Sequence, residues 1–202
     1  MSVAATTFSF PISAFPPLAL GFFGLGTGYL IYGPQELFGF PARDKAVDVS
    51  TGIWGIWMPG FLQFLTGTYL FVGLVWFHSF AEPPLYATAL AFTAYGVHWF
   101  AIGLGRTFGG DPRPNAFMSI AFLVISVLGI IVFFHANDDP VGGLFIGLSC
   151  VYVAEFFASL GSVGKALGER ALGFFHLGTG AWLMYLFFAV TLNFAAGYHL
   201  TV

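Results

Sequence analysis

Six long apolar stretches, separated by short segments that contain proline, glycine or charged residues, dominate the chain. Most are close to the roughly 20 residues that an α-helix needs to cross a bilayer. Regular strand alternation is not sustained in any of them. We therefore predict an all-α integral membrane protein with six transmembrane helices in one domain, residues 1–202. The predicted spans are 18–32, 51–77, 85–104, 116–135, 141–160 and 172–194, and the first extends toward Phe40 across a break at Gly33-Pro34.

Composition supports this prediction and excludes several classes of protein. Hydrophobic residues make up 58% of the chain and charged residues 7%, which leaves too little polar surface for a soluble domain. The single cysteine, Cys150, excludes an internal disulfide and a zinc–thiolate cluster. A net charge of -3 without a basic patch argues against nucleic acid. Since hydrolase signatures such as G-x-S-x-G and H-E-x-x-H are absent from the sequence, we expect no catalytic residues, no metal and no cofactor.

The basic residues predict how the chain is oriented in the membrane. All six lie in the first, third and fifth connections between spans, and the other connections offer only histidine and acidic residues. The positive-inside rule places such connections in the cytoplasm. We therefore expect a multi-pass protein of the cell membrane, surrounded by lipid, with both termini extracytoplasmic. The six residues are Arg43, Lys45, Arg106, Arg113, Lys165 and Arg170.

Glycine is abundant, with 27 residues, and recurs at spacings that bring helices together. In lipid, small residues four apart allow two helix backbones to approach closely. We expect this packing role for Gly24 with Gly28, for Gly143 with Gly147, and for Gly55, Gly60 and Gly67 along the second span.

A few polar side chains fall at membrane depth, where each is costly enough to need a partner or a function. Tyr95 and His98 are three residues apart and share one face of the third span. Glu155 lies in the fifth span, where it is a candidate for relaying protons, for pairing with His98 or His176, or for a subunit interface. The set, which suggests a polar track, is Gln63, Tyr95, His98, Glu155, His176 and Asn193.

Five stretches, in order along the chain, resemble the acetate uptake transporters of the succinate-acetate permease type. The most specific is the third, which is similar to an Ala-Phe-Thr-Ser-Tyr-Gly-x-x-Trp segment of that family. The five are Pro17-Leu-Ala-Leu20 with Phe23-Gly-Leu25, Gly55-x4-Gly60-x2-Gln63-x3-Gly67, Ala91-Phe-Thr-Ala-Tyr-Gly-Val-His-Trp99, Asp111 with Pro114-Asn-Ala116, and Tyr185-Leu186 with Leu192-Asn193.

The resemblance implies a homohexamer in which each subunit has its own pore for a small-molecule substrate, with acetate as the first candidate and succinate as a second. It implies a narrow point formed by Phe23, Tyr95 and Leu148, with Gln63 as a nearby hydrogen-bond donor and Trp99 supporting the wall. Proton coupling is favoured by physics, because a bare carboxylate loses several kcal/mol of solvation in an apolar constriction. Glu155 and His98 are the candidates for a proton relay.

A second family with the same six-helix hexameric architecture, the proton-gated urea and amide channels, provides an alternative. Parts of the second span and of the third connection resemble it as well. These are Gly60-Phe-Leu-Gln63-x3-Gly-Thr-Tyr-Leu70, and Thr107-Phe-Gly109 with Asp111 and Arg113-Pro114. A third hypothesis is that the protein is a structural or accessory membrane subunit that transports no solute.

Overall fold

The computed structural model describes residues 18–161 and 164–202, which are helical apart from short connections. The proline pair that precedes the first predicted span, and with it Pro17 of the first resembling stretch, lies outside the described residues. The described residues form six helical spans, and their second span is divided by two π-helical turns. The elements are α1 (Leu18–Phe38), then α2 (Lys45–Gly55), η1 (Ile56–Phe61), α3 (Leu62–Phe71) and η2 (Val72–Trp76) within the second span, then α4 (Pro84–Phe108), α5 (Arg113–His135), α6 (Asp139–Ser159) and α7 (Lys165–Ala196).

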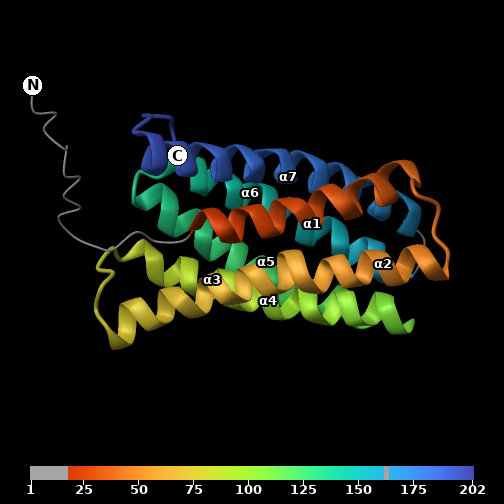
Figure 1. Cartoon of the computed structure of the whole chain (residues 1–202). Helices are drawn as coiled ribbons and strands as arrows, with labels where there is room; N and C mark the ends of the chain where they lie inside the picture. The colour runs from red at the N-terminus through yellow and green to blue at the C-terminus, as the bar shows by residue number, and fades with distance from the viewer. Residues whose placement is uncertain (1–17, 162–163) are drawn as a thin grey trace, which may run out of the picture.

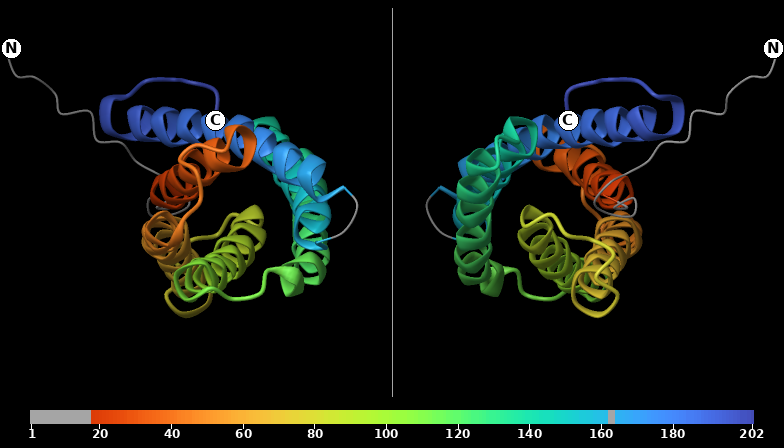
Figure 2. Two further views of the ribbon diagram at one scale, coloured as in Figure 1. Left: turned by 90° about the vertical axis from the view of Figure 1, so that its right-hand side faces the viewer. Right: turned by 90° about the vertical axis from the view of Figure 1, so that its left-hand side faces the viewer.

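The six spans lie side by side and form a closed ring when the molecule is viewed along its length (Figures 1 and 2). Around the ring, α1 contacts α7, α7 contacts α6, α6 contacts α5, and α5 contacts α4. The second span completes it, because α2 and α3 pack on α4 while α3 and η1 pack on α1. The first and last spans are therefore neighbours.

Five of the spans in the described residues are long and apolar enough to cross a membrane: Lys45–Trp76, Pro84–Phe108, Arg113–His135, Asp139–Ser159 and Lys165–Ala196. Their outer faces are apolar; Val124 is 65% exposed and Phe174 is 62% exposed. Polar side chains such as Gln63 and His98 are instead buried between helices. This distribution, apolar outside and partly polar inside, is that of a multi-pass membrane protein.

The existence of six spans is confirmed, but several predicted helix ends are wrong. The second span begins at Lys45 rather than Thr51, because the Asp44 carboxylate caps the helix by accepting a hydrogen bond from Val47 N at 2.8 Å. The last span begins at Lys165 rather than Leu172. Hydropathy marks where a helix is apolar, and these polar first turns extend beyond that part.

The expected break at Gly33-Pro34 is also wrong, since α1 continues through Pro34 to Phe38. Proline removes one hydrogen bond of the helix, but packing against α7 holds the chain in helical form here. A Cβ on Gly33 would lie 2.9 Å from Leu177 Cγ, and a Cβ on Gly173 would lie 2.4 Å from Leu37 N. The backbones of α1 and α7 are thus in close contact on both sides of the proline.

Glycines also set the contact between α1 and the second span. A Cβ on Gly24 would lie 2.6 Å from Met58 O, and one on Gly28 would lie 2.6 Å from Pro59 Cγ. Pro59 itself lies within η1, where the wider π-helical turn accommodates the missing N–H. In α6, Gly147 faces Thr179 of α7, whereas a Cβ on Gly143 would meet nothing within 4 Å.

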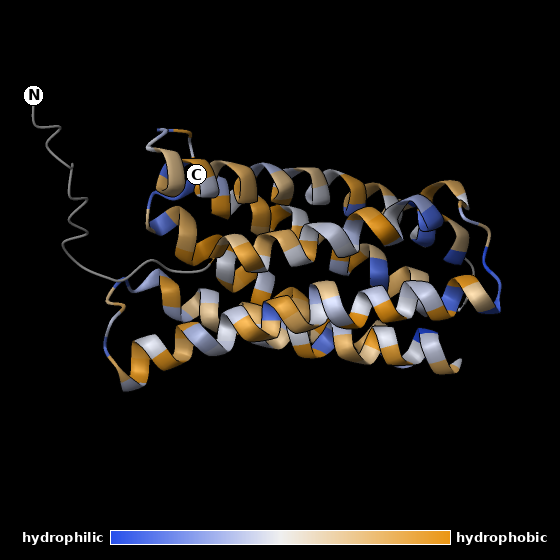
Figure 3. Ribbon diagram, viewed as in Figure 1, coloured by the Kyte–Doolittle hydropathy of each residue, from blue (hydrophilic) through white to orange (hydrophobic). Residues whose placement is uncertain are grey.

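The six basic residues all lie at one end of the bundle. The connections α1–α2, α4–α5 and α6–α7 are at this end, and hydrophilic residues gather at the first of them (Figure 3). The beginning of α1 and the end of α7 are at the opposite end (Figure 1). We refer to these as the basic end and the opposite end.

Candidate functional site

A cavity of about 300 Å³ enters the ring from the basic end. Its lining residues come from α1, α2, α4, α6 and α7, from the first turn of α5, and from the connections beside them. Arg106 lines it two residues before α4 ends, and His98 lines it eight residues earlier in the same helix. At a rise of about 1.5 Å per residue, the cavity therefore reaches roughly 12 Å into the bundle from Arg106.

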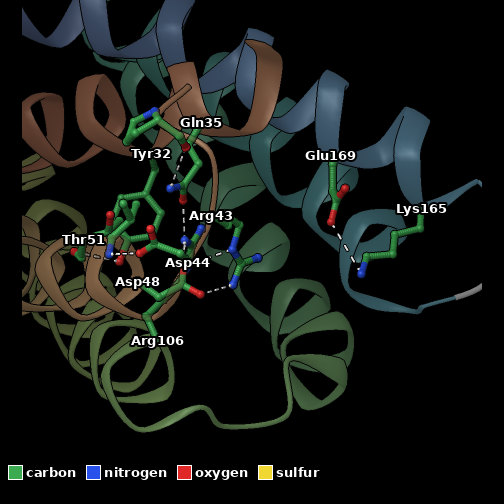
Figure 4. A network of polar contacts seen from close by, with 11 residues as sticks. Tyr32, Gln35, Arg43, Asp44, Asp48, Thr51, Arg106, Lys165 and Glu169 are labelled. Atoms are coloured by element: carbon green, nitrogen blue, oxygen red, sulfur yellow. Dashed lines mark hydrogen bonds and ion pairs between the residues drawn. The ribbon is translucent and has the colours of Figure 1, made fainter. Parts of the chain in front are cut away.

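The mouth of the cavity is organised around Arg106 (Figure 4). Its Nη1 donates hydrogen bonds to Asp48 Oδ1 at 2.8 Å and to Gln35 Oε1, and its Cζ lies 4.9 Å from the centroid of the Tyr32 ring. Arg43 Nε donates to the same Asp48 carboxylate at 3.0 Å. Because two guanidinium groups share one carboxylate, this cluster keeps an excess positive charge.

Two further pairs of opposite charge lie at this end of the cavity. The Arg113 guanidinium forms hydrogen bonds with the Asp111 carboxylate and holds the pKa of Asp111 down at about 2. Lys165 Nζ lies 3.6 Å from Glu169 Oε1, one turn along α7. The excess charge at the mouth therefore comes from the Arg43, Arg106 and Asp48 cluster.

Two imidazole–carboxylate pairs lie deeper in the cavity. His176 Nδ1 of α7 is 2.5 Å from Glu36 Oε2 of α1, which is hydrogen-bonding distance. His98 Nε2 of α4 is 3.8 Å from Glu155 Oε1 of α6, which is too long for a direct hydrogen bond. Of the alternatives for Glu155, the structure thus pairs it with His98, while His176 takes a different carboxylate.

Aromatic rings fill the space between these two pairs. The Tyr29 ring packs on the His176 ring with centroids 4.3 Å apart. The centroid of the Trp99 ring lies 6.0 Å from that of the His98 ring and 6.4 Å from that of the His176 ring, so Trp99 lies beside both pairs. The polar groups of the inner cavity are therefore held in rigid, largely apolar walls.

An aromatic cluster closes the inner end. The rings of Tyr95, Phe122 and Tyr152 lie 5.5 to 5.6 Å from one another. The Tyr95 hydroxyl and Ser126 Oγ form a hydrogen bond of 2.9 Å, which ties α4 to α5. Tyr152 lines the cavity, whereas Tyr95 lies behind it. This cluster separates the cavity from the opposite end of the bundle.

A comparison with solved structures finds the same arrangement of helices in a bacterial acetate channel. The structure of the bacterial acetate channel SatP superposes with a TM-score of 0.68 and 21% sequence identity, over 94% of this chain and 98% of that one. The chain shares the fold of SatP. This confirms the resemblance to acetate uptake transporters at the level of the fold. No protein-family model and no curated protein matches the sequence.

Within this SatP-like fold, three of the seven residues predicted from the sequence line the cavity: His98, Trp99 and Glu155. Tyr95 and Leu148 are each 2% exposed and belong to the core behind its inner end. Leu148 lies one helical turn before Tyr152 on α6, so it shares the face of that ring.

The other two predicted residues, Gln63 and Phe23, are not on the cavity wall. Gln63 is fully buried, and neither its Nε2 nor its Oε1 has a hydrogen-bond partner in the part of the chain that the structure describes. Phe23 is half-buried against Phe187 of α7, with ring centroids 5.0 Å apart. Its neighbour Phe22 is the buried one and packs on Phe92 of α4.

Sequence reasoning missed several residues that line the cavity. Tyr29, Tyr32 and Glu36 are three and four residues apart, so they share one face of α1, and Tyr152 lies three residues before Glu155 on α6. This spacing is a signal that the sequence contains. Asn193, which the sequence places among the polar residues at depth, instead ties the segment that follows α7 back to the helix through two hydrogen bonds of 2.8 Å to the Leu200 backbone.

Proposed function

We propose that this protein is a membrane channel or transporter for small monocarboxylates such as acetate, with succinate as a further candidate solute. One observation carries the proposal: a cavity enters a ring of membrane-spanning helices beside an excess positive charge and ends at an aromatic cluster. Positive charge in a narrow mouth attracts anions and repels cations. The fold shared with an acetate channel supports the same conclusion.

The solute crosses together with a proton in this proposal. A carboxylate that leaves water for an apolar constriction loses several kcal/mol of solvation, whereas the neutral acid avoids most of that cost. Glu155 and His98 hold and relay the accompanying proton. Their burial and their position on the cavity wall, inward of Arg106, support this role.

The narrow point of the path is formed by Tyr95 and Leu148, and the Tyr95–Phe122–Tyr152 cluster supports this assignment. Gln63 binds the solute as it passes, and Trp99 supports the wall. We also assign Phe23 to this narrow point. This assignment is supported by the family resemblance alone, because in the structure the Phe23 ring packs on Phe187.

A channel for urea or short-chain amides is the second candidate, and Gln63 is the observation that favours it. Its buried amide offers an NH2 donor group and an oxygen acceptor, and neither has a hydrogen-bond partner among the described residues. A primary amide complements both, and so does a neutral carboxylic acid. The positive mouth favours the acid, because an amide gains nothing from that charge.

The protein acts in the cell membrane as a homohexamer with one pore per subunit and has no enzymatic role. Its apolar outer faces support contact with lipid or neighbouring subunits. Both termini face the outside, which is supported by the gathering of all six basic residues at the other end of the bundle.

Transport by purified protein in liposomes tests the proposed function. Uptake of labelled acetate, succinate, urea and acetamide is compared with and without an inwardly directed proton gradient. We expect acetate uptake to be fastest and to increase with the gradient. Uptake of urea and acetamide that is faster than acetate uptake and insensitive to the gradient would favour the second candidate. If no solute is taken up, transport is rejected and a structural or accessory membrane subunit is the hypothesis that stands.

Two arginine variants make this test specific to the mouth. Arg106→Gln removes positive charge from the cavity mouth, so acetate uptake should fall several-fold relative to acetamide uptake. Arg113→Gln is the matched control, because Arg113 lies at the same end but its side chain is 73% exposed and paired with Asp111. Equal effects of the two variants on the ratio of acetate to acetamide would contradict a role for the mouth.

A further inference from the structure

His98 is buried in the cavity wall, and its ring makes no hydrogen bond to a described residue. Its side chain is 4% exposed, and neither Nδ1 nor Nε2 has a hydrogen-bond partner among residues 18–161 and 164–202. A buried polar group without a hydrogen-bond partner destabilises the folded protein. The carboxylate that faces it, Glu155, is 9% exposed, and it too makes no hydrogen bond to a described residue. The pair therefore offers hydrogen-bonding groups to whatever occupies the cavity.

The other imidazole–carboxylate pair differs in this respect. His176 and Glu36 already contact each other at 2.5 Å, so they join α7 to α1 and leave no gap between them. The 3.8 Å between His98 Nε2 and Glu155 Oε1 is instead too long for a hydrogen bond. Two pairs of the same chemistry therefore line one cavity. We call His176–Glu36 the closed pair, because its two side chains bond each other, and His98–Glu155 the open pair, because its side chains do not.

We propose that His98 and Glu155 form the binding site for the carboxyl group of the transported monocarboxylic acid. The proposal rests on the function proposed above. The solute's carbonyl oxygen accepts a hydrogen bond from the His98 ring N–H, and its hydroxyl donates to Glu155 Oε1. The proton of the acid thus lies between the solute and Glu155, no covalent bond to carbon changes, and the solute enters with one proton.

Charge is the reason that the acid is bound rather than its anion. Glu155 as a carboxylate accepts hydrogen bonds but cannot donate one. An acetate anion beside it would place two negative charges at hydrogen-bonding distance in a site of low dielectric, which is strongly unfavourable. A shared proton removes this repulsion, and the net charge of the site is the same before and after the solute binds.

Groups from every neighbouring helix face this site. Tyr152 of α6 and Phe122 of α5 pack on the His98 ring, with centroids 5.8 and 4.7 Å away. The titratable groups across the cavity are Tyr29 and Glu36 of α1 and His176 of α7. The positive charge of Arg106 lies toward the mouth, where Asp48 and Gln35 hold it.

The pH dependence of acetate binding tests the proposal. Equilibrium binding of labelled acetate is measured on the purified protein in nanodiscs from pH 5.5 to 7.5. For the wild type, the apparent Kd for total acetate should rise about tenfold per pH unit, since each acetate binds with one proton. In Glu155→Gln, the neutral amide donates to the carboxylate itself. The slope should then fall close to zero, and at pH 7.5 the variant should bind acetate more tightly than the wild type.

Glu36→Gln is the matched control, because it makes the same change in the closed pair of the same cavity. Its slope should remain that of the wild type. His98→Phe should weaken binding about tenfold at every pH without changing the slope, since one hydrogen bond of the order of 1.4 kcal/mol is lost. This variant also tests the site if Glu155→Gln does not fold, which size-exclusion chromatography reveals.

The outcomes separate this site from the proposed function. If the wild type transports and binds acetate while Glu155→Gln keeps the wild-type slope or His98→Phe keeps the wild-type affinity, the site is wrong and the function stands. If both glutamate variants flatten the slope equally, the proton is not specific to the open pair and the site is wrong as well. If the wild type neither transports nor binds acetate, the proposed function is rejected and this site with it.

Discussion

Gln63 shows how a single buried residue can indicate a binding role. Its side chain is fully buried, and both atoms of its amide lack a hydrogen-bond partner among the described residues. Such an amide destabilises the folded protein by about 1–3 kcal/mol unless something binds to it. Because the Gln63 amide destabilises the fold and makes no hydrogen bond that offsets this, we expect it to bind a solute.

We predict that Gln63→Leu raises the melting temperature of the solute-free protein and slows acetate uptake. Leucine has a similar volume and removes the unpartnered polar atoms. Gln35→Leu is the control, since Gln35 accepts from Arg106 and donates to Pro41 O, and its loss should lower the melting temperature. Thermal unfolding and liposome uptake give the two readouts. A Gln63→Leu protein with unchanged uptake would restrict Gln63 to a packing role.

The second prediction at this scale concerns Tyr95, whose ring and hydroxyl have separable roles. Tyr95→Phe removes the hydrogen bond to Ser126 and should cost about 1 kcal/mol of stability while keeping size selection. Tyr95→Ala opens a space at the inner end of the cavity and should cost about 3–5 kcal/mol. Uptake of acids of increasing length measures the difference. We expect only the alanine variant to admit larger acids, and equal profiles would remove Tyr95 from the path.

Sequence reasoning could find which residues are polar at membrane depth but not which of them meet. The sequence singles out His98 and Glu155 because a charged or polar residue in an apolar span is rare. Their pairing joins α4 to α6, and that of His176 with Glu36 joins α7 to α1. These contacts depend on the order of helices around the ring, which hydropathy does not contain. For the same reason, the sequence indicates only that Arg106 helps to set the orientation of the chain in the membrane, and not that it lies at the mouth of a cavity.

At the scale of the helices, glycines decide which faces can touch. Gly24 approaches η1 so closely that a Cβ would lie 2.6 Å from Met58 O and 2.7 Å from Leu62 Cβ. Gly178 in α7 has nothing within 4 Å of the position of a Cβ. Both residues lie inside α-helices, so they differ only in what surrounds them.

We predict opposite effects of alanine at these two positions. Gly24→Ala should push α1 away from the second span and destabilise the protein by more than the gain in helix propensity. Gly178→Ala should stabilise it by about 0.5–1 kcal/mol, because alanine favours the helix and meets no obstacle. Thermal unfolding in detergent compares the two. A stabilising Gly24→Ala would contradict the tight contact between α1 and η1.

The helices also show where pattern reasoning succeeds and where it fails. Six spans follow from hydropathy alone, because each must satisfy its backbone within lipid. Their ends do not follow, since polar first turns such as the one capped by Asp44 are helical without being apolar. The helix through Gly33-Pro34 depends on α7, a partner more than a hundred residues away, so local sequence signals predict a break there.

For the whole molecule, the distribution of charge along the bundle axis is the dominant feature. All six basic residues lie at one end, in the α1–α2 connection or in the helix turns beside the α1–α2, α4–α5 and α6–α7 connections, and the cavity opens at the same end. The closed ring places α1 beside α7, so the beginning of the first span and the end of the last lie together at the opposite end. The side of the membrane on which the chain termini lie therefore also determines the side to which the cavity opens.

We predict that the basic end faces the cytoplasm and that the C-terminus is extracytoplasmic. Basic connections are retained on the cytoplasmic side during insertion, and a signal of six from six residues on one end leaves no competing loop. A reporter that is active only outside the cytoplasm should therefore work when it is fused after Val202. The same reporter inserted at Gly110, in the α4–α5 connection, should be silent, and a reporter that requires the cytoplasm should show the reverse pattern. A C-terminal fusion active only in the cytoplasm would turn the cavity mouth to the outside, and acetate would then first meet Arg106 from that side.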